Sequence, residues 1–305
     1  MPPPLSVVSQ AARRARQLVL LPAVAVLLLS ACDESIPPPG SINETYTLWG
    51  AFDPGSDVQA VRVVPITDTI GLGSRDALDV TVLSTNLATG AETVWRDSVV
   101  QYANGAIGHV FLADLNPDFE SRHVFRVVRP EGREISALVP IPPFVEPLLQ
   151  TVGVTAREVT YPIFWPGAPQ VNAPTLTFFV ESGTCVQDSV QIPFPGSSDP
   201  AEFGWQMALR LGEVSGPIVA QFEEPMALLR LTVRGEVASE GWRLPLAATR
   251  DRELLVQPTV LTNVENGFGF IGSAYRTSLT WSPTPDELQR SAFEARNFGE
   301  DCSRE

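Results

Sequence analysis

Residues 123–140 read HVFRVVRPEGREISALVP, and this stretch indicates the fold class of the chain. Two largely apolar runs, 124–128 and 134–139, flank the short turn RPEGR. Alternation with a period of two is the pattern of a half-buried strand, and Gly132 supplies a residue that accepts a positive φ in a tight turn. The stretch therefore predicts an antiparallel hairpin.

The rest of the N-terminal half repeats this pattern. The run LDVTV at 78–82 alternates, the turn LATGA follows, and the run 92–100 completes another predicted hairpin. Short strands at this spacing are typical of an antiparallel sandwich of immunoglobulin-like size, which we assign to residues 45–142. The sequence PIPPF at 140–144 ends this domain, because consecutive prolines cannot continue a strand ladder.

The second half is also rich in predicted strands. Apolar or alternating runs, broken by proline and glycine, predict a second β domain over residues 150–282, either a sandwich or a partial barrel. The runs are 176–180, 205–211, 218–222, 228–233 and 254–260. The predicted fold class is therefore all-β, with two tandem antiparallel β domains.

A short helix is expected near the C-terminal end. TPDE at 284–287 has the pattern of a capping box with proline at the first helical position. Leu288, Ala292 and Ala295 would then share one helix face, and Gly299 is a typical stop. We predict a helix over residues 284–299.

The first 32 residues indicate export. Three arginines precede an aliphatic run at 18–29, which leads into LSAC and ends at Cys32. The run is shorter than the roughly 20 residues that span a bilayer, and its flanks predict a cleaved signal peptide, residues 1–31. LSAC resembles the lipobox of bacterial lipoproteins, which implies that Cys32 is acylated and becomes the new N-terminus. The alternative is an ordinary secretory peptide with an incidental cysteine.

The chain is strongly acidic, with a formal net charge of -14. Removal of the first 31 residues takes away three arginines and no acid, which leaves a net charge of -17. Such a charge repels nucleic acid and anionic headgroups, so we expect no nucleic-acid partner, and we expect lipid to hold the protein at the membrane. Residues 32–44 are rich in proline and acid, and we interpret them as a flexible tether. We expect the protein in the cell envelope, anchored on the periplasmic or surface face of the outer membrane.

Two cysteines remain beside Cys32. Cys185 lies in the polar stretch ESGTCVQDS, and Cys302 lies near the C-terminal end. In an oxidising compartment an even remainder indicates a disulfide, so we predict a bond between Cys185 and Cys302, with two unpaired thiols as the alternative. Neither cysteine has the spacing of a zinc ligand set, and no metal site is predicted.

The stretch NVENGFGFIG at 263–272 contains G-x-G-x-x-G, formed by Gly267, Gly269 and Gly272. A dinucleotide-binding loop needs a strand before it and a helix after it. The residues that follow, 275–281, instead alternate like a strand. We therefore expect these glycines at a strand turn or bulge, and we predict no cofactor.

The same segment, TNVENGFGFIGS at 262–273, resembles the C-terminal signature of a widespread family of Gram-negative lipoproteins built on a domain of unknown function. YTLWGAFDP at 46–54 and the hairpin at 123–142 resemble the N-terminal immunoglobulin-like domain of that family. The resemblance covers about residues 45–280, and the helix predicted after Trp281 departs from it. It implies a lipid-anchored envelope protein, and it makes a TonB-dependent outer-membrane transporter the candidate partner, because family members often occur beside one.

Few residues of the chain are suited to catalysis. There is no lysine, and both histidines, His109 and His123, are placed at predicted strand starts and interpreted as structural. Neither lies in a setting typical of a Ser-His-Asp hydrolase. We expect that the protein is not an enzyme. Paired carboxylates for polymer hydrolysis stay open as an alternative, because their separation depends on the fold.

Three aromatic residues, Tyr161, Phe164 and Trp165, lie between prolines in YPIFWPG. An exposed loop of this kind would stack on a sugar ring or fill a partner's pocket, whereas a buried one would fill the junction between the two domains, which we favour. The sequence as a whole predicts an accessory or ligand-binding component of an envelope complex. A surface adhesin and an envelope-polymer hydrolase are the alternatives.

Overall fold

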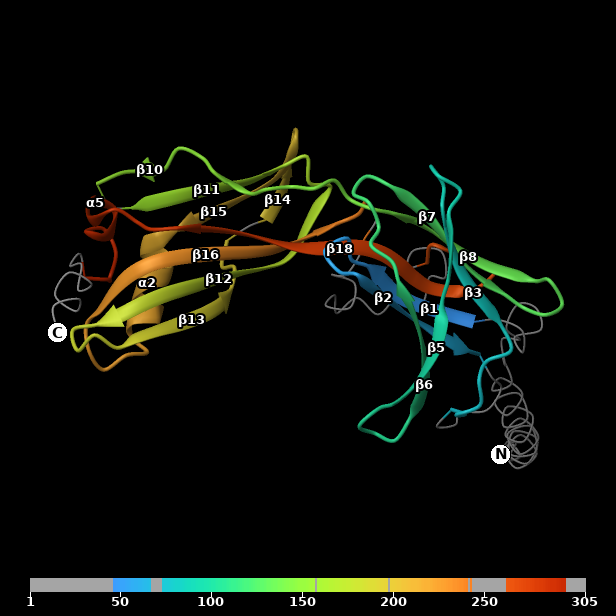
Figure 1. Ribbon diagram of the computed structural model, residues 1–305. Helices are drawn as coiled ribbons and strands as arrows, with labels where there is room; N and C mark the ends of the chain where they lie inside the picture. The colour runs from blue at the N-terminus through green and yellow to red at the C-terminus, as the bar shows by residue number, and fades with distance from the viewer. Residues whose placement is uncertain are drawn as a thin grey trace, which may run out of the picture. The chain divides into compact units, whose positions relative to one another are not determined.

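The structure, a computed structural model, describes residues 46–66, 73–156, 158–196, 198–240, 242 and 262–294. The predicted signal peptide at 1–31, the tether at 32–44 and the predicted strand at 254–260 lie outside these residues. The described elements are almost all strands, with two short helices, so the prediction of an all-β fold is confirmed (Figure 1). Within the described ranges, neither helix has the length and apolar character of a bilayer span.

The first part of the chain forms short strands that join two different sheets. These strands are β1 (Tyr46–Phe52), β2 (Val58–Pro65), β3 (Thr81–Asn86), β4 (Glu92–Val94), β5 (Arg96–Gln101), β6 (Ile107–Asp114), β7 (Arg122–Val128) and β8 (Glu134–Pro140).

The hairpin predicted at 124–139 is confirmed as β7 and β8. The two strands pair in antiparallel register, with Val128 opposite Glu134. Gly132 has a φ of 82° in the turn between them. This positive φ is the conformation for which the turn needs glycine.

The hairpin predicted over 78–100 differs from the prediction in its second strand. β3 and β4 pair as expected, but the run 92–100 is interrupted at Trp95, and β5 pairs with β6 in another sheet. The Trp95 ring is buried, and its Nε1 donates a hydrogen bond to Ser84 Oγ at 3.0 Å. The run changes sheets at this point because the indole occupies the core between the two layers.

The second part of the chain is again built from strands, together with both helices. Its elements are β9 (Leu148–Leu149), β10 (Gly153–Val154), β11 (Val159–Pro166), β12 (Gln170–Ser182), β13 (Gln187–Pro193), β14 (Ser198–Ala201), β15 (Gly204–Arg210), α2 (Leu211–Val219), β16 (Met226–Ala238), β17 (Val264–Glu265), β18 (Phe268–Trp281) and α5 (Pro285–Leu288).

These strands form one large sheet and two smaller ones among the described residues. The eight-stranded sheet has the order β13-β12-β16-β18-β1-β2-β6-β5. One five-stranded sheet has the order β17-β8-β7-β3-β4, and the other contains β10, β11, β15 and β14 with β9 paired to β11. The pair of β1 and β18 is parallel, which the sequence pattern did not indicate, because β18 returns from the end of the chain to lie beside its first described strand.

The two larger apolar cores of the described residues lie against opposite ends of the large sheet, and a small third cluster contains Ala238, Trp242 and Ala274. The N-terminal core contains Leu48, Phe52, Phe111 and Phe125, and the late residue Ile271 belongs to it. The second core contains residues of β11, β12, β15, β16 and α2, together with Tyr275 and Phe293. Each of the two larger cores is enclosed by sheets on two sides, which is sandwich packing, and β18 contributes to both.

One predicted strand in the second half is a helix instead. The run 218–222 begins inside α2, whose buried residues include Leu211, Val214 and Ile218. These residues recur every three to four positions, which is the helical spacing, and they bury one face against the second core. A short apolar run does not distinguish this arrangement from a strand.

The predicted C-terminal helix begins as expected but is much shorter. Thr284 and Glu287 form the capping box, in which Thr284 N donates to Glu287 Oε2 at 2.8 Å. The helix ends at Leu288, and Ala292, expected on its buried face, is exposed. Phe293 is buried instead and stacks on Phe178 at 5.9 Å, so tertiary packing redirects the chain after one turn. Ala295 and Gly299 lie outside the described residues.

Candidate functional site

Strand β18 changes partners halfway along its length. Residues 268–273 pair with β1, and residues 274–281 pair with β16 on the opposite edge. The side-chain amide of Asn263 accepts a hydrogen bond from Ile271 N at 3.0 Å and donates one to Ile271 O at 2.7 Å. It therefore takes the place of a neighbouring strand at the point of change.

The glycine motif serves close packing at this crossover. Gly267 follows the turn after β17, and Gly269 and Gly272 lie within β18, with a strand and no helix after them. A Cβ atom at residue 269 would lie 2.0 Å from the Leu48 carbonyl oxygen, and one at residue 272 would lie 1.9 Å from the Trp242 ring. The prediction that these glycines belong to a strand turn or bulge is confirmed, since the motif lets β18 approach β1 and Trp242.

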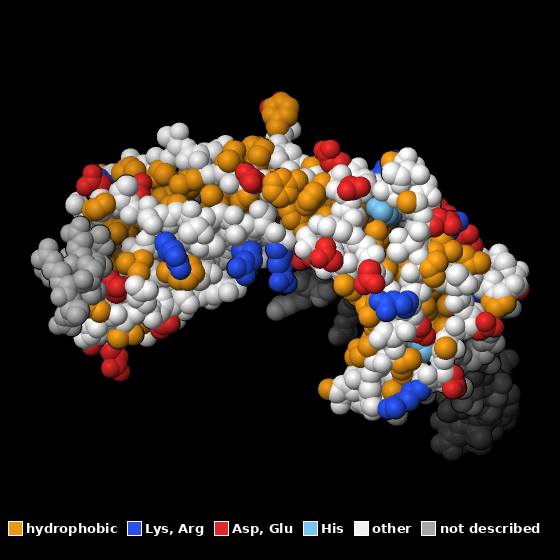
Figure 2. Space-filling model, viewed as in Figure 1, with side chains coloured by type: hydrophobic (Ala, Val, Ile, Leu, Met, Phe, Trp, Pro, Cys, Tyr) orange, Lys and Arg blue, Asp and Glu red, His pale blue; other side chains and the backbone are white. Residues whose placement is uncertain are grey.

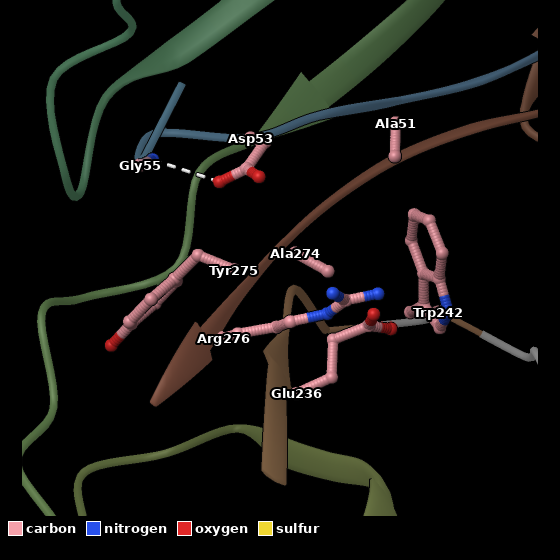
Figure 3. Close-up of a pocket in the computed structure, with 8 residues that line it drawn as sticks. All are labelled: Ala51, Asp53, Gly55, Glu236, Trp242, Ala274, Tyr275 and Arg276. Carbon is pink, nitrogen blue, oxygen red and sulfur yellow. Dashed lines mark hydrogen bonds between the residues drawn. The ribbon is translucent and has the colours of Figure 1, made fainter. Parts of the chain in front are cut away.

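A cavity of about 480 Å³ opens where β1 and β16 end beside β18 (Figure 3). Asp53 and Gly55 line it from the turn after β1, Glu236 lines it from β16, and Arg276 lines it from β18. Glu236 and Arg276 are cross-strand partners, and their side chains extend toward Trp242 in Figure 3. The cavity is thus formed by residues from distant parts of the chain that meet only at the crossover.

The two acids of this cavity have different environments. Asp53 Oδ1 accepts a hydrogen bond from Gly55 N at 2.8 Å, which holds the turn after β1. Burial raises the pKa of Glu236 above its ordinary value, the charge of Asp53 raises it further, and Arg276 acts in the opposite direction. Glu236 therefore holds a proton more readily than an exposed glutamate does.

A polar surface continues from the cavity along the sheet. The outward residues of β16 and β18 include the exposed Arg230, Arg234 and Arg276, and we call the surface that they share the arginine face. No ion pair joins any of the three to a described acid. Figure 2 shows a short row of basic side chains, separated mainly by neutral atoms, over this part of the molecule.

Hydroxyl and amide side chains fill the space between these arginines. Register places Thr232 beside Thr280 and Thr177, and most of their outward neighbours on the sheet are polar, with Phe179 beside Arg230 as an aromatic exception. Thr232 and Thr280 share a hydrogen bond of 2.8 Å between their hydroxyl groups. The other outward polar residues are Thr175, Ser189, Gln191 and Ser278.

The aromatic stretch singled out in the sequence does not form a loop. Tyr161, Phe164 and Trp165 all lie in β11, and Tyr161 and Trp165 are 0% exposed. Tyr161 and Trp165 belong to the second core, whereas Phe164 is half-buried on the other face of β11, so the stretch is a strand and not an exposed ligand loop. The strand tolerates Pro162 because its carbonyl accepts from Gln150 N, which turns the missing N–H away from β15.

The cysteines are only partly within the described residues. Cys185 is disulfide-bonded and has a φ of 63° in the turn between β12 and β13. Cys32 and Cys302 lie outside the described residues, so lipidation of Cys32 and the pairing of Cys185 with Cys302 stay predictions. Among the described residues, no three His, Cys, Asp or Glu side chains are grouped to hold a metal ion.

Both histidines lie in the N-terminal core region. His109 Nδ1 donates to Asp97 Oδ2 at 2.8 Å, and His123 Nε2 is hydrogen-bonded to Ser121 Oγ at 3.2 Å. The His123 ring is buried and packs 5.6 Å from the Phe52 ring. Burial lowers the pKa of His123 below its ordinary value of 6.5, and the charge of Asp118 partly opposes this effect.

Stability should therefore fall on acidification through His123. The unfolded chain binds a proton near pH 6.5 while the folded chain still resists it, so this stabilisation is complete above pH 6.5 and is lost as the pH falls below it. We expect His123→Gln to reduce the slope of the unfolding free energy against pH between pH 7 and 5. Urea denaturation at several pH values measures the slope, and an unchanged slope would exclude His123 as its source.

The residues of the cavity and the arginine face were not singled out from the sequence. The signal is present in RLTVRGE at 230–236, where polar and apolar residues alternate, but alternation alone does not show which face stays open. The approach of Asp53 to Glu236 depends on the parallel pairing of β1 and β18, two strands separated by more than 200 residues. No local pattern reports such a contact.

Comparison with known proteins does not identify the chain. No family model matches it, and no curated protein matches it. A pullulanase complexed with maltotriose from Anoxybacillus sp. LM18-11 is similar at 8% identity and a TM-score of 0.22, over 63% of this chain and 24% of the pullulanase. Bovine butyrophilin is similar at 11% identity and a TM-score of 0.21, over 62% of this chain and 91% of butyrophilin.

The chain thus spans about a quarter of the pullulanase that it matches. Likenesses at these TM-scores have no bearing on function. The resemblance to the lipoprotein family stays a prediction.

Proposed function

We propose that the protein is a lipid-anchored envelope protein that acts as an accessory or ligand-binding component of an outer-membrane complex and has no catalytic role. The observation that carries the ligand-binding role is the arginine face with the adjoining cavity. Arg230 and Arg234 are exposed and form no ion pair with a described acid, so their guanidinium groups can bind an anion, whereas Arg276 lies opposite Glu236. Their placement on a continuous sheet keeps them in fixed register.

The sequence supports the place of action. The expected signal peptide and Cys32 predict a lipid anchor, and residues 32–44 are the predicted tether before the first strand. Confinement to a membrane raises the effective concentration of the arginine face near any partner in the same membrane. An outer-membrane β-barrel of the TonB-dependent transporter class is the partner that we propose.

A second candidate function, hydrolysis of an envelope polymer, is favoured by one observation. Asp53 and Glu236 line the same cavity, and the pKa of Glu236 is raised, as a general acid requires. Release of reducing ends from envelope polysaccharide by the purified protein, abolished in Glu236→Gln, would establish this function in place of a binding role. We expect no release from either protein.

Capture from native membranes tests the proposed function. Gentle detergent extraction and affinity capture of the full-length protein should recover an outer-membrane β-barrel, identified by mass spectrometry. Cys32→Ser is the matched control, because it should leave the fold intact, release the protein from membranes and lose the barrel. Repeated capture without a barrel would contradict the partnership, and a Cys32→Ser protein that still sediments with carbonate-washed membranes would contradict the lipid anchor.

A further inference from the structure

We propose that the arginine face binds a linear polysaccharide that carries carboxylate groups. This inference rests on the proposed ligand-binding function and names the chemistry of the ligand. The face has three guanidinium groups, with neutral hydroxyl and amide side chains between them and a cavity at one end. Each of these features matches one property of such a polymer.

The spacing of the arginines fits an extended ligand. Arg230 and Arg234 are four residues apart on β16, which separates their Cα atoms by about 13 Å. Arg276 lies on β18 opposite Glu236, two residues further along the strand. The row therefore covers about 20 Å, and a small anion would occupy only one of its positions.

The guanidinium groups are available for carboxylates. All three arginines are exposed, and Arg230 Cζ lies 4.1 Å above the centre of the Phe179 ring. Stacking on the ring restricts the Arg230 side chain and leaves its N–H groups directed outward along the ring plane. A carboxylate accepts two parallel hydrogen bonds from such a fork.

The residues between the arginines match sugar hydroxyl groups. Thr175, Thr177, Thr280, Ser278 and Gln191 provide groups that both donate and accept hydrogen bonds. On β12 they alternate with buried apolar residues, and on β18 with the half-buried Thr277, Leu279 and Trp281, so they project together from one side of the sheet. A flat ribbon of sugar rings meets such a surface along its whole length.

Other classes of partner fit this face less well. A protein interface is usually built around buried aromatic and apolar anchors, whereas the outward positions here are mostly hydroxyl, amide and arginine side chains, and the aromatic Phe179 lies beneath Arg230. Nucleic acid carries roughly one charge per 1.7 Å, which a chain of net charge -14 repels along its full length. A polysaccharide with one carboxylate per sugar places fewer charges near the rest of the acidic surface.

Binding to alginate, a linear polyuronate, tests the inference. Calorimetry in 150 mM salt should show binding to the wild-type protein, with neutral dextran as the uncharged comparison. The variant Arg230→Gln/Arg234→Gln/Arg276→Gln should bind alginate more than tenfold more weakly. Its far-UV spectrum and melting temperature should match those of the wild type, because all three side chains are exposed.

A charge-matched control separates the site from general electrostatics. Arg62, Arg75 and Arg96 are exposed arginines of the N-terminal half, away from the arginine face, and their triple change to Gln alters the net charge equally. This control should bind alginate as the wild type does. Glu236→Gln should bind more tightly, because it removes the negative charge opposite Arg276.

Three results would overturn the inference: no alginate binding by the wild type, equal loss in the control, or polyphosphate bound as tightly as alginate. None of these results bears on the proposed membrane partnership, since capture of a membrane partner is measured without any polysaccharide. A captured barrel together with absent alginate binding would retain the accessory role and reject this ligand. Alginate binding without a captured barrel would retain the polysaccharide ligand and reject the barrel partner.

Discussion

Gly269→Ala should lower the free energy of unfolding by about 4 kcal/mol, as backbone strain and overpacking act on the same residue. Gly269 has a φ of 100°, a region that L residues with a side chain rarely adopt. The added Cβ would also lie 2.0 Å from the Leu48 carbonyl oxygen, which belongs to the backbone of the paired strand and has no freedom to move aside. Denaturant titration followed by tryptophan fluorescence measures the loss.

Gly132→Ala is the matched control for this change. Gly132 also has a positive φ, 82°, but a Cβ there would meet no atom within 4 Å. Only the cost of the left-handed conformation applies, about 1 kcal/mol. Equal losses in the two variants would show that close packing of β18 against β1 contributes nothing beyond the backbone conformation.

Removal of the disulfide should have an effect of comparable size. If its partner is Cys302, Cys185→Ser is expected to lower the free energy of unfolding by up to about 5 kcal/mol, the loop-closure value for a bond that would enclose more than a hundred residues. The cause is the release of the unfolded chain from a restraint, so the folded secondary structure should change little. Thermal and urea denaturation of the mature protein measure the effect.

Cys302→Ser tests the identity of the partner. If Cys185 and Cys302 are bonded to each other, the two single variants and the double variant should all lose the same amount, and reducing the wild type should reproduce that loss. Thiol labelling of the denatured, unreduced protein should modify neither residue. Additive losses, or full labelling of both cysteines, would refute the pairing.

The sequence allowed those elements to be predicted whose pattern is local. The hairpin of β7 and β8 was predictable because the alternation and the turn glycine lie within 18 consecutive residues. Strand β11 was mistaken for a loop because Pro162 and Pro166 are poor strand residues. The structure accepts them because the neighbouring strand β9 is short and pairs only with Ile163 and Phe164.

Longer-range features were beyond such patterns. The sequence predicts a strand where the structure has helix α2, because a short apolar run fits either element. The helix is favoured by packing of its buried residues against the second core. The cavity depends on the meeting of Asp53 and Glu236, which follows from pairing between the two ends of the chain. The sequence shows alternating polar residues at the positions of the arginine face. It does not show which side of the sheet is open to solvent, because that depends on where the second layer of the sandwich packs.

The shared strand β18 determines the order in which this chain can fold. Its first residues complete the sheet of the N-terminal sandwich, and its last residues complete the sheet of the second. Because β18 is one of the last parts of the chain to leave a ribosome or a translocation channel, neither sandwich is complete until almost the whole chain has emerged. Contacts of such long sequence separation are slow to form and leave the edges of β1 and β16 open in the meantime. During that interval the open edges would need protection from pairing with other chains, and neither half is a unit that a contiguous fragment would reproduce.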